Sequence, residues 1–396
     1  MVKSNINALG IIFPNYYDSL VPELVNERLM GSIPFASRYR LIDFVLSSMV
    51  NSGINSVSVL VREKYHSLMD HLGSGREWDL VRKNGGLTIW PPYAEKGMNL
   101  YGGRIEALDH TLDYLRKQKE KYVIMADTNV AVNFDFRKLV ATHEANDADV
   151  TVAYTVEEIP EGSLKAENAK RGMYYTFDFD ESGRVSKWHI NTKEKGVHNL
   201  GMNIYCFNRE YLINLIDDAF IRGNIYLERD ILAKEVDKIK IYGHKYIGYC
   251  SRICDMKSYF QENMKLLEDE NLEGLFAGGP IYTKLRDDNP TRYINGAAVK
   301  NTMAADGCVI EGTVENCILF RGVKIGKGAV VKNCVLMQDT VVESGVKAEY
   351  IITDKNAVIT SGKELKGADS FPIYIAKHQV LQNTSGCKIS FHKKFS

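Results

Sequence analysis

Apolar side chains recur at six-residue intervals in the last third of this sequence. They lie on two tracks, Cys317, Val323, Ala329, Val335 and Val341 on one and Leu319, Ile325, Val331 and Met337 on the other. The turns between them carry Gly312, Gly322, Gly326, Gly328 and Gly345. A hexapeptide repeat is typical of a parallel β-helix, in which each turn buries its apolar face only against the next turn. We therefore predict a β-helix with a C-terminal tail over residues 294–396, with the pattern weakest near residues 343–358.

The earlier part of the chain has the pattern of alternating helices and strands. Apolar residues recur at three- and four-residue steps between Leu41 and Val50, which predicts a helix with one broad buried face. The β-rich run from Val57 to Val61 follows at once and predicts a buried strand. These patterns predict an α/β domain over residues 1–267, and the charged and turn-forming residues at 268–293 predict a linker.

Composition narrows the classes of partner. The chain of 396 residues has 50 Lys plus Arg and 50 Asp plus Glu, so no net charge attracts nucleic acid or an acidic membrane. Its start, MVKSNINALGIIF, has only a short apolar run, which predicts neither a secretory signal nor a membrane span. We expect a cytoplasmic protein that binds neither nucleic acid nor membrane.

A long segment of the sequence resembles a known family. Residues 34–54 read PF-x-x-x-YR-x-IDF-x-LS-x-x-VNSGI, and further similar segments follow in order: HLGSGREWDL, WPPY, DFRKLVATHEANDADVTVA and YFQENMKLL. This wording resembles bacterial ADP-glucose pyrophosphorylases, which make ADP-glucose for glycogen synthesis from ATP and glucose-1-phosphate. The resemblance implies a Rossmann-like nucleotidyltransferase domain with a mixed, mostly parallel sheet, followed by a left-handed parallel β-helix.

The phosphate-binding loop of that family is altered here. Family members have the glycine-rich pattern GG-x-G-x-RL after the first strand, because backbone N–H groups must approach the nucleotide phosphates. The same place reads Pro14-Asn15-Tyr16-Tyr17-Asp18-Ser19-Leu20, and we expect Asp18 to put a negative charge where the triphosphate would sit. Met30 also stands where the family has a lysine that binds substrate or activator. The sequence therefore predicts that this loop does not cradle a triphosphate in the usual way.

The metal-binding positions are altered as well. Asp127, which follows an apolar strand, matches the family aspartate that holds the catalytic magnesium. Arg252 stands where the second metal-binding aspartate is expected, and a cation there repels a metal. Asp255 is the nearest substitute, three positions away, and Arg104 in LYGGRIEA places a bulky guanidinium in the pocket. We predict no intact catalytic set, a doubtful magnesium site at Asp127, and no certain cofactor.

The sugar-phosphate positions are degenerate. Asn191 replaces a phosphate-binding lysine, and Gly201 begins the run that matches the family's SMG motif. Lys187, Lys193 or Lys195 are alternatives, although a lysine at a strand end is more often simply solvated.

Two arginines precede the first predicted helix and form a candidate effector site. Arg38 and Arg40 are two residues apart, and their forked donors suit a phosphorylated, anionic effector. The alternative is that they are solvated or structural ion-pair partners.

The altered phosphate, metal and sugar-phosphate positions bear on which function is expected. A chain of this family with these changes resembles a GlgD-type regulatory subunit, which implies assembly with a catalytic GlgC-type subunit into a heterotetramer, or else a homo-oligomer. The alternative is an active sugar-phosphate nucleotidyltransferase with a rearranged site. A hexapeptide acyltransferase is less favoured, because residues 291–370 contain no histidine to act as a base.

Overall fold

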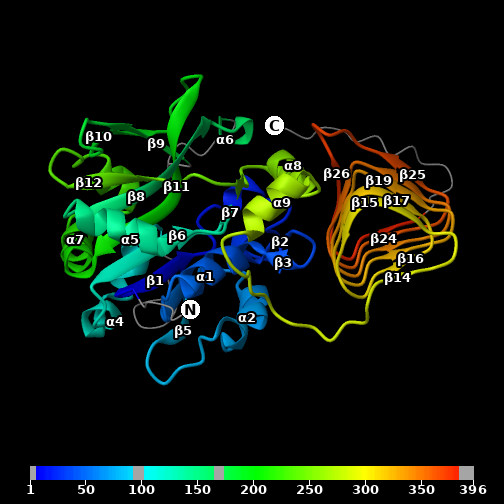
Figure 1. Ribbon diagram of the computed structural model, residues 1–396, viewed down its shortest axis with the longest axis horizontal. Coiled ribbons are helices and arrows are strands. Elements are labelled where there is room, and N and C mark those ends of the chain that lie inside the picture. Colours follow the sequence, from blue (N-terminus) through cyan, green and yellow to red (C-terminus); the bar gives the residue numbers. More distant parts are fainter. Residues whose placement is uncertain (1–5, 92–101, 165–173, 383–396) are drawn as a thin grey trace. The chain divides into compact units, whose positions relative to one another are not determined.

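The computed structural model describes residues 6–91, 102–164 and 174–382. The chain divides into two compact units, with the main boundary between Arg286 and Asp287 (Figure 1). Parts of the family-like runs WPPY and LYGGRIEA lie outside the described residues.

The first unit is built on a mixed sheet whose strands run in the order β10-β9-β11-β6-β1-β4-β5, with β8 joining β11 to β12. Strands β5, β4, β1 and β6 are mutually parallel, whereas β11 is antiparallel to β6. Two further pairs, β2–β3 and β7–β13, form separate two-stranded sheets. The strands of these three sheets are β1 Ala8–Phe13, β2 Pro34–Phe35, β3 Tyr39–Arg40, β4 Ser56–Leu60, β5 Gly86–Trp90, β6 Tyr122–Asp127, β7 Val130–Val132, β8 Val150–Glu158, β9 Tyr175–Phe179, β10 Val185–Ile190, β11 Val197–Asn208, β12 Ile241–Lys245 and β13 Cys250–Arg252.

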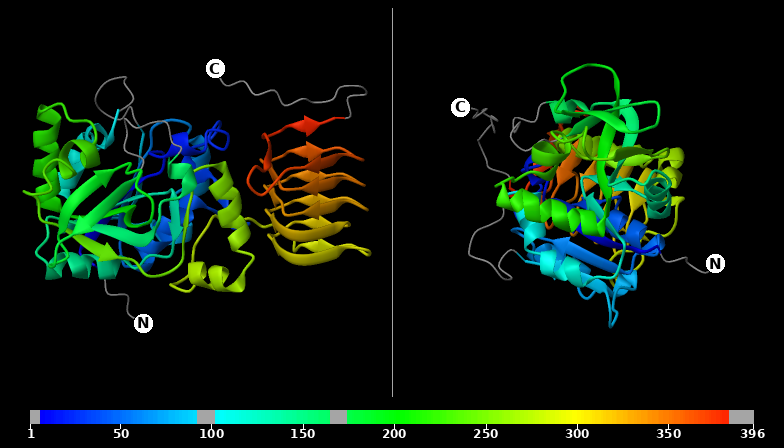
Figure 2. Two further views of the ribbon diagram at one scale, coloured as in Figure 1. Left: turned by 90° about the horizontal axis from the view of Figure 1, so that it is seen from above. Right: turned by 90° about the vertical axis from the view of Figure 1, so that its left-hand side faces the viewer.

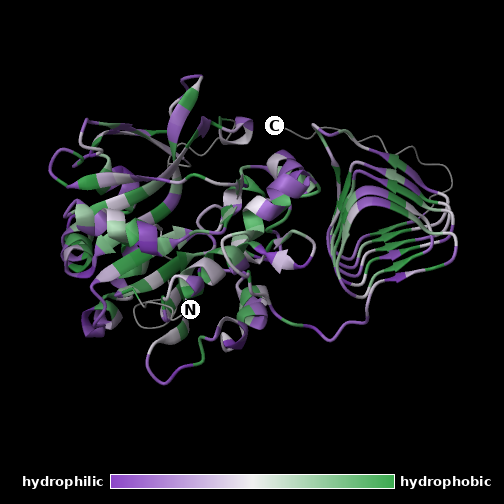
Figure 3. Cartoon of the chain, viewed as in Figure 1, coloured by the Kyte–Doolittle hydropathy of each residue, from purple (hydrophilic) through white to green (hydrophobic). Residues whose placement is uncertain are grey.

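Helices cover both faces of this sheet. They are α1 Leu41–Asn51, α2 His66–Leu72, α3 Arg104–Asp109, α4 Leu112–Lys117, α5 Phe136–Ala145, α6 Glu161–Leu164, α7 Arg209–Ile221, α8 Met256–Lys265 and α9 Asp269–Phe276. Single 3-10 turns are η1 Asp18–Leu20, η2 Met30–Ser32 and η3 Arg76–Trp78, and η4 Leu227–Leu232 is a short π-helix. The helix predicted from residue 41 is α1, and its apolar residues join β4 and β6 in one buried cluster. Helices α3 and α7 contribute to a second cluster with β1, β6 and β11. Figure 3 shows the apolar residues concentrated along the central strands.

The stretch expected to be a linker begins with a helix. Helix α9 occupies residues 269–276, and Leu275 on it is buried. Charged residues alone suggested a linker there, but Phe276 packs against the rings of Tyr39 and Phe44, which adds this helix to the first unit. The extended stretch from Gly279 to Thr291 follows it.

The second unit is a parallel β-helix, as the repeat predicts, and Figure 2 shows its strands stacked turn upon turn. Its strands are β14 Arg292–Tyr293, β15 Ala298–Ala304, β16 Val309–Ile310, β17 Thr313–Leu319, β18 Lys324–Ile325, β19 Val330–Lys332, β20 Val335–Leu336, β21 Val341–Val342, β22 Lys347–Glu349, β23 Ile351–Thr353, β24 Val358–Ile359, β25 Glu364–Lys366, β26 Ile373–Ile375 and β27 Val380–Leu381. Cys317, Val331 and Leu336 belong to its fully buried interior.

The register of the β-helix differs from a strict six-residue repeat. Val314 pairs with Val331, and Val331 with Ala348, so equivalent residues in these central turns recur after 17 positions, one fewer than three hexapeptides. The offset is 15 residues between β15 and β17 and 22 residues between β23 and β26. Asn316 and Asn333 turn one corner with φ of 52° and 51°, a left-handed conformation that Asn tolerates, and their side chains are hydrogen-bonded over 3.3 Å. The stack also continues in register through residues 343–358, where the sequence pattern is weakest.

No helix among the described residues is both long enough and apolar enough to span a membrane.

Candidate active site: a carboxylate paired with an internal arginine

Asp127 lies at the carboxyl end of the central strand β6, where open α/β sheets place their chemistry. Its neighbour in the sheet is Phe13 at the end of β1, and β11 flanks β6 on the other side. The position is therefore the one that the sequence predicts. The Asp127 side chain is almost completely buried, with 1% of its surface exposed.

The partner of Asp127 is a cation supplied by the chain itself. Arg104 begins helix α3, its side chain is fully buried, and its Nη2 donates a short hydrogen bond to Asp127 Oδ2. Its Nη1 lies 2.9 Å from Oε1 of Glu228, which is also fully buried and comes from η4. Gly103 makes this placement possible, because a Cβ at this residue would lie 2.2 Å from the Ile225 carbonyl oxygen. One guanidinium thus joins two carboxylates from distant parts of the chain.

Aromatic rings surround the guanidinium. The Arg104 Cζ lies 4.2 Å from the ring centroid of Tyr16, 4.9 Å from that of Phe13 and 5.7 Å from that of Tyr205. Rings at such distances attract a cation through their quadrupoles. We call Arg104, Asp127, Glu228 and these three aromatic residues the arginine cluster.

The arginine cluster contains two carboxyl groups but only one positively charged group. Burial raises the pKa of Asp127 to about 7, the Arg104 guanidinium lowers it and the Glu228 carboxylate raises it. Asp127 Oδ1 and Glu228 Oε2 have no hydrogen-bond partner among the described residues. Two buried carboxylates face one guanidinium, so protonation of one carboxyl near neutral pH brings the cluster toward electrical balance.

The loop after β1 closes over Arg104 instead of forming a phosphate cradle. Tyr16 comes from this loop, and the hollow between it, Arg62 and Gly103 measures only about 20 Å³, room for about one water molecule. The Asp18 carboxylate accepts a 2.7 Å hydrogen bond from the Met30 backbone N–H, and burial raises its pKa to about 7. Repulsion of a triphosphate by Asp18 stays a prediction. Met30, in place of the family lysine, is buried. The loop is a packed structural element.

Arg252 does not face Asp127 as a free cation. Its Nη2 lies 3.0 Å from Glu157 Oε1, and its Nη1 donates a 2.9 Å hydrogen bond to the Gly201 carbonyl. The structure thus brings together two residues, Arg252 and Gly201, that the sequence assigned to separate sites. Asp255 is not available as a substitute, because it caps α8 by accepting a 2.7 Å hydrogen bond from Ser258 N–H.

Asn191, at the position of the sugar-phosphate lysine, has a turn geometry. Its φ is 51°, its N–H donates to the Tyr174 carbonyl over 3.1 Å, and its Oδ1 accepts from Tyr174 N–H over 3.2 Å. These contacts hold the end of β10. The three lysines considered as alternatives, Lys187, Lys193 and Lys195, are exposed.

These residues do not fit a catalytic magnesium ion. The one retained carboxylate is bound to Arg104, and the second metal-binding position holds Arg252. Across residues 6–91, 102–164 and 174–382, no group of three or more His, Cys, Asp and Glu side chains could hold a metal ion. The Arg104 guanidinium thus neutralises the buried Asp127 carboxylate, a role that a bound metal ion would have in the resembled site.

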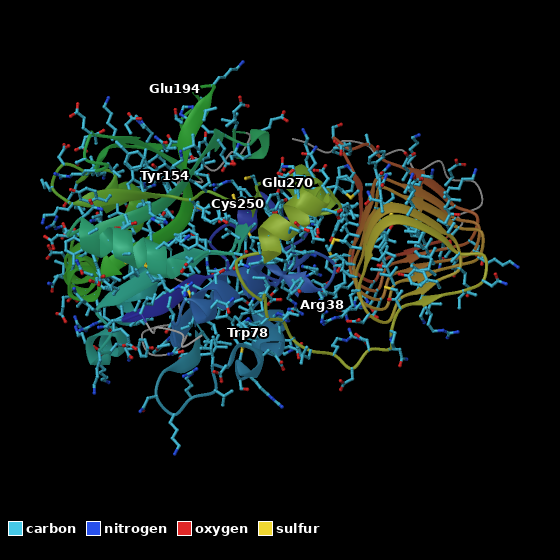
Figure 4. The ribbon with its side chains drawn as sticks, in the orientation of Figure 1. Arg38, Trp78, Tyr154, Glu194, Cys250 and Glu270 are labelled. Atoms are coloured by element: carbon cyan, nitrogen blue, oxygen red, sulfur yellow. The ribbon has the colours of Figure 1, made fainter. Side chains whose placement is uncertain are left out.

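The two arginines of the predicted effector site lie around the short β2–β3 hairpin, where Figure 4 labels Arg38. Arg40 ends β3 and precedes α1, and its Nη1 donates to the Ser67 carbonyl over 2.7 Å and to Ser67 Oγ over 3.1 Å. Its own N–H donates to Asp43 Oδ2, while Asp43 Oδ1 lies 2.6 Å from His71 Nε2. Arg40 therefore connects α1 to α2, and effector binding by Arg38 and Arg40 stays a prediction.

We expect Arg40→Ala to lower the free energy of unfolding by about 1–3 kcal/mol, because the Ser67 carbonyl loses a charged donor. Arg40→Lys is the matched control, since it keeps the charge and should recover part of the loss. Urea denaturation measures both. Equal stability of Arg40→Ala and the unaltered chain would show that the Ser67 contact is not structural.

Sequence reasoning missed four members of the arginine cluster: Glu228, Tyr16, Phe13 and Tyr205. Arg104 stood out as a departure from the family, but Glu228 and Tyr16 carried no signal of a partnership with it. The signal available in the sequence was the positive charge that Arg104 adds, because a buried cation needs a buried anion as its partner.

Two family models match this chain. A nucleotidyl transferase model matches residues 24–222, and a GlmU-like C-terminal hexapeptide model matches residues 286–370. The glycogen biosynthesis protein GlgD of Geobacillus stearothermophilus is 36% identical over 341 residues, which cover 83% of each chain. The GlgD of Bacillus subtilis (strain 168) is 33% identical over 326 residues, 82% of each chain. A glucose-1-phosphate adenylyltransferase of G. stearothermophilus is 32% identical over 307 residues, 76% of each chain.

Proposed function

Because this chain belongs to the family of GlgD glycogen biosynthesis proteins and glucose-1-phosphate adenylyltransferases, we propose that it is a regulatory subunit with little or no catalytic activity of its own. The family reaction converts ATP and glucose-1-phosphate to ADP-glucose and diphosphate. In this proposal the chain contributes to glycogen biosynthesis by assembling with a catalytic subunit.

The arginine cluster is the observation that carries the proposal. Adenylyl transfer needs cations placed against the phosphates as charge develops on them, and a free carboxylate is needed to hold a metal there. Here the Asp127 carboxylate is bound to Arg104, whose side chain has no exposed surface. Separating such a buried pair costs about 3–5 kcal/mol. A metal and nucleotide would have to meet that cost before any chemistry began.

The surroundings of the cluster add to the cost. Tyr16 packs over the guanidinium at 4.2 Å, so opening the site also requires movement of the loop after β1. At the sugar-phosphate end, Asn191 supplies no positive charge and is occupied with Tyr174. Among the described residues, the family positions at both ends of a nucleotide-sugar site therefore do not offer the groups that would bind phosphate.

A subunit without a working site acts on turnover only through the conformation of a partner. It raises the partner's rate if it binds the partner's active conformation more tightly than its inactive one. We propose the catalytic GlgC-type subunit as that partner, in a heterotetramer, with a phosphorylated effector as a possible further ligand. The β-helix presents stacked strands that offer a surface for assembly.

We expect co-expression with a catalytic subunit of the same organism to yield one mixed species, measured by size-exclusion chromatography with mass determination. In that species the catalytic rate or its response to effectors should differ from that of the catalytic subunit alone. Separate elution at micromolar concentration, with unchanged kinetics on mixing, would refute a regulatory role.

A further inference from the structure

A second hollow lies in the first unit, on elements that the arginine cluster does not use. It has a volume of about 450 Å³, within the range of about 300–1,000 Å³ that is common for small-molecule sites. Its walls come from the end of α1, the β7–α5 loop, the first turn of α5, the end of β12 with the residues that follow it, and α9 with the residues that follow it. We call it the α5 pocket.

The walls of the α5 pocket are held by contacts within the chain. Ser52 Oγ accepts a 2.9 Å hydrogen bond from Phe136 N–H at the start of α5, and Asn133 Nδ2 donates to the Gly279 carbonyl over 2.9 Å. The rings of Phe134 and Tyr246 stack with centroids 5.5 Å apart. The pocket is thus formed in the free chain and has one aromatic wall.

The charge of the α5 pocket is positive. Arg137, Lys138 and Lys245 line it, against a single lining carboxylate, Asp135. Asp135 is already paired with Arg137, at 2.7 Å between Arg137 Nε and Asp135 Oδ1. Neither Lys138 nor Lys245 forms an ion pair with any described residue. Asp135 also attracts the charge of Lys138. The lining therefore carries three cations against one carboxylate, an excess of two positive charges.

The pKa of His244 is affected by the positive charge of the α5 pocket. Its Nδ1 lies 2.8 Å from Thr142 Oγ1 on α5, which fixes the ring at the pocket wall. Burial lowers the pKa of His244, and the charge of Lys138 lowers it further. A neutral imidazole there is a hydrogen-bonding group and adds no charge at neutral pH.

We propose that the α5 pocket binds a small phosphate monoester, such as a sugar phosphate, with the phosphate between Lys138 and Lys245. A phosphate monoester carries close to two negative charges at neutral pH, which matches the excess of two positive charges on the pocket lining. A phosphate group alone fills only a small part of 450 Å³, and the remainder beside Phe134 and Tyr246 accommodates a carbon skeleton. Asp127 does not line this pocket, and the inference does not depend on whether the chain is catalytic.

Isothermal titration of the full chain with glucose 6-phosphate, inorganic phosphate and glucose tests the proposal. We expect saturable one-to-one binding of glucose 6-phosphate, weaker binding of inorganic phosphate and none of glucose. Lys138→Ala with Lys245→Ala should weaken glucose 6-phosphate binding about tenfold or more for each lysine, since each charged contact contributes about 1.5–3 kcal/mol. Circular dichroism should show that this variant remains folded.

The matched control is Lys83→Ala with Lys117→Ala, which removes two exposed lysines from elsewhere in the same unit. Unchanged binding by the control supports a defined pocket. Equal loss in both double variants would overturn the proposal in favour of a general charge effect. Absence of binding at millimolar glucose 6-phosphate, or equal affinity for glucose and its phosphate, would also overturn it.

Discussion

Replacing Arg104 with alanine is expected to lower the free energy of unfolding by about 3–5 kcal/mol, the usual cost of removing one partner from a buried ion pair. The variant leaves Asp127 and Glu228 buried without a cation, since both contact only this guanidinium among the charged groups described. It also removes the group that packs against Tyr16. Chemical denaturation of the purified chain measures the loss.

Two variants control that result. Arg104→Lys keeps a positive charge but cannot reach two carboxylates with a rigid fork, so it should recover only part of the stability. Arg116→Ala removes an exposed ion pair with Asp217, which solvent screens, so it should cost far less stability than Arg104→Ala. If Arg104→Ala were as stable as Arg116→Ala, the cluster would not be the structural centre described above.

The loss in Arg104→Ala should also depend on pH. Arg104 lowers the pKa of Asp127, so its removal raises that pKa further above the unfolded value. A carboxyl with a raised folded pKa binds a proton on folding, and the stability this brings is lost as pH rises through the folded pKa. The destabilisation should therefore be smaller at pH 5 than at pH 8.

The second large effect is the expected lack of turnover by the chain alone. Removing a single stabilising donor from an active site commonly costs about 10²–10³ in rate. Here a metal carboxylate is occupied by Arg104, the second metal position is Arg252, and the phosphate loop is a packed element. We expect ADP-glucose formation at least about a thousandfold below that of a catalytic relative, because each 1.4 kcal/mol or so of lost stabilisation is about tenfold in rate. Arg104→Ala should not restore it, since Arg252 and the altered loop remain.

Much of the fold could be predicted from local patterns. The apolar spacing in residues 41–50 predicted α1, and the β-rich run after it predicted β4. The repeat predicted the β-helix, although its central turns repeat after 17 residues and not after 18, with Asn316 and Asn333 in the left-handed conformation at one corner. Helix α9 was missed because its charged surface resembles a linker, while Leu275 and Phe276 supply only a narrow apolar contact.

The sequence showed which family residues are missing from the site, but it did not show which contacts take their place. Asp127 lies at the end of β6 as expected, because motif and strand position agree. The pairing of Arg104 with Glu228 joins residues far apart in the sequence, and no local spacing encodes such a contact. Arg252 was expected to repel a metal, yet it pairs with Glu157 on β8, and no local pattern predicts that β8 lies beside it.

ADP-glucose formation from ATP and glucose-1-phosphate, measured with the purified chain alone and again with a catalytic subunit added, separates the two possible roles. The chain carrying Asp127→Ala supplies the background from contaminating enzyme. We expect the unaltered chain alone to be indistinguishable from that background, and the mixture to differ in rate or effector response from the catalytic subunit alone. Turnover by the chain alone within about tenfold of a catalytic relative, abolished by Asp127→Ala, would contradict a regulatory role and identify an active enzyme with a rearranged site.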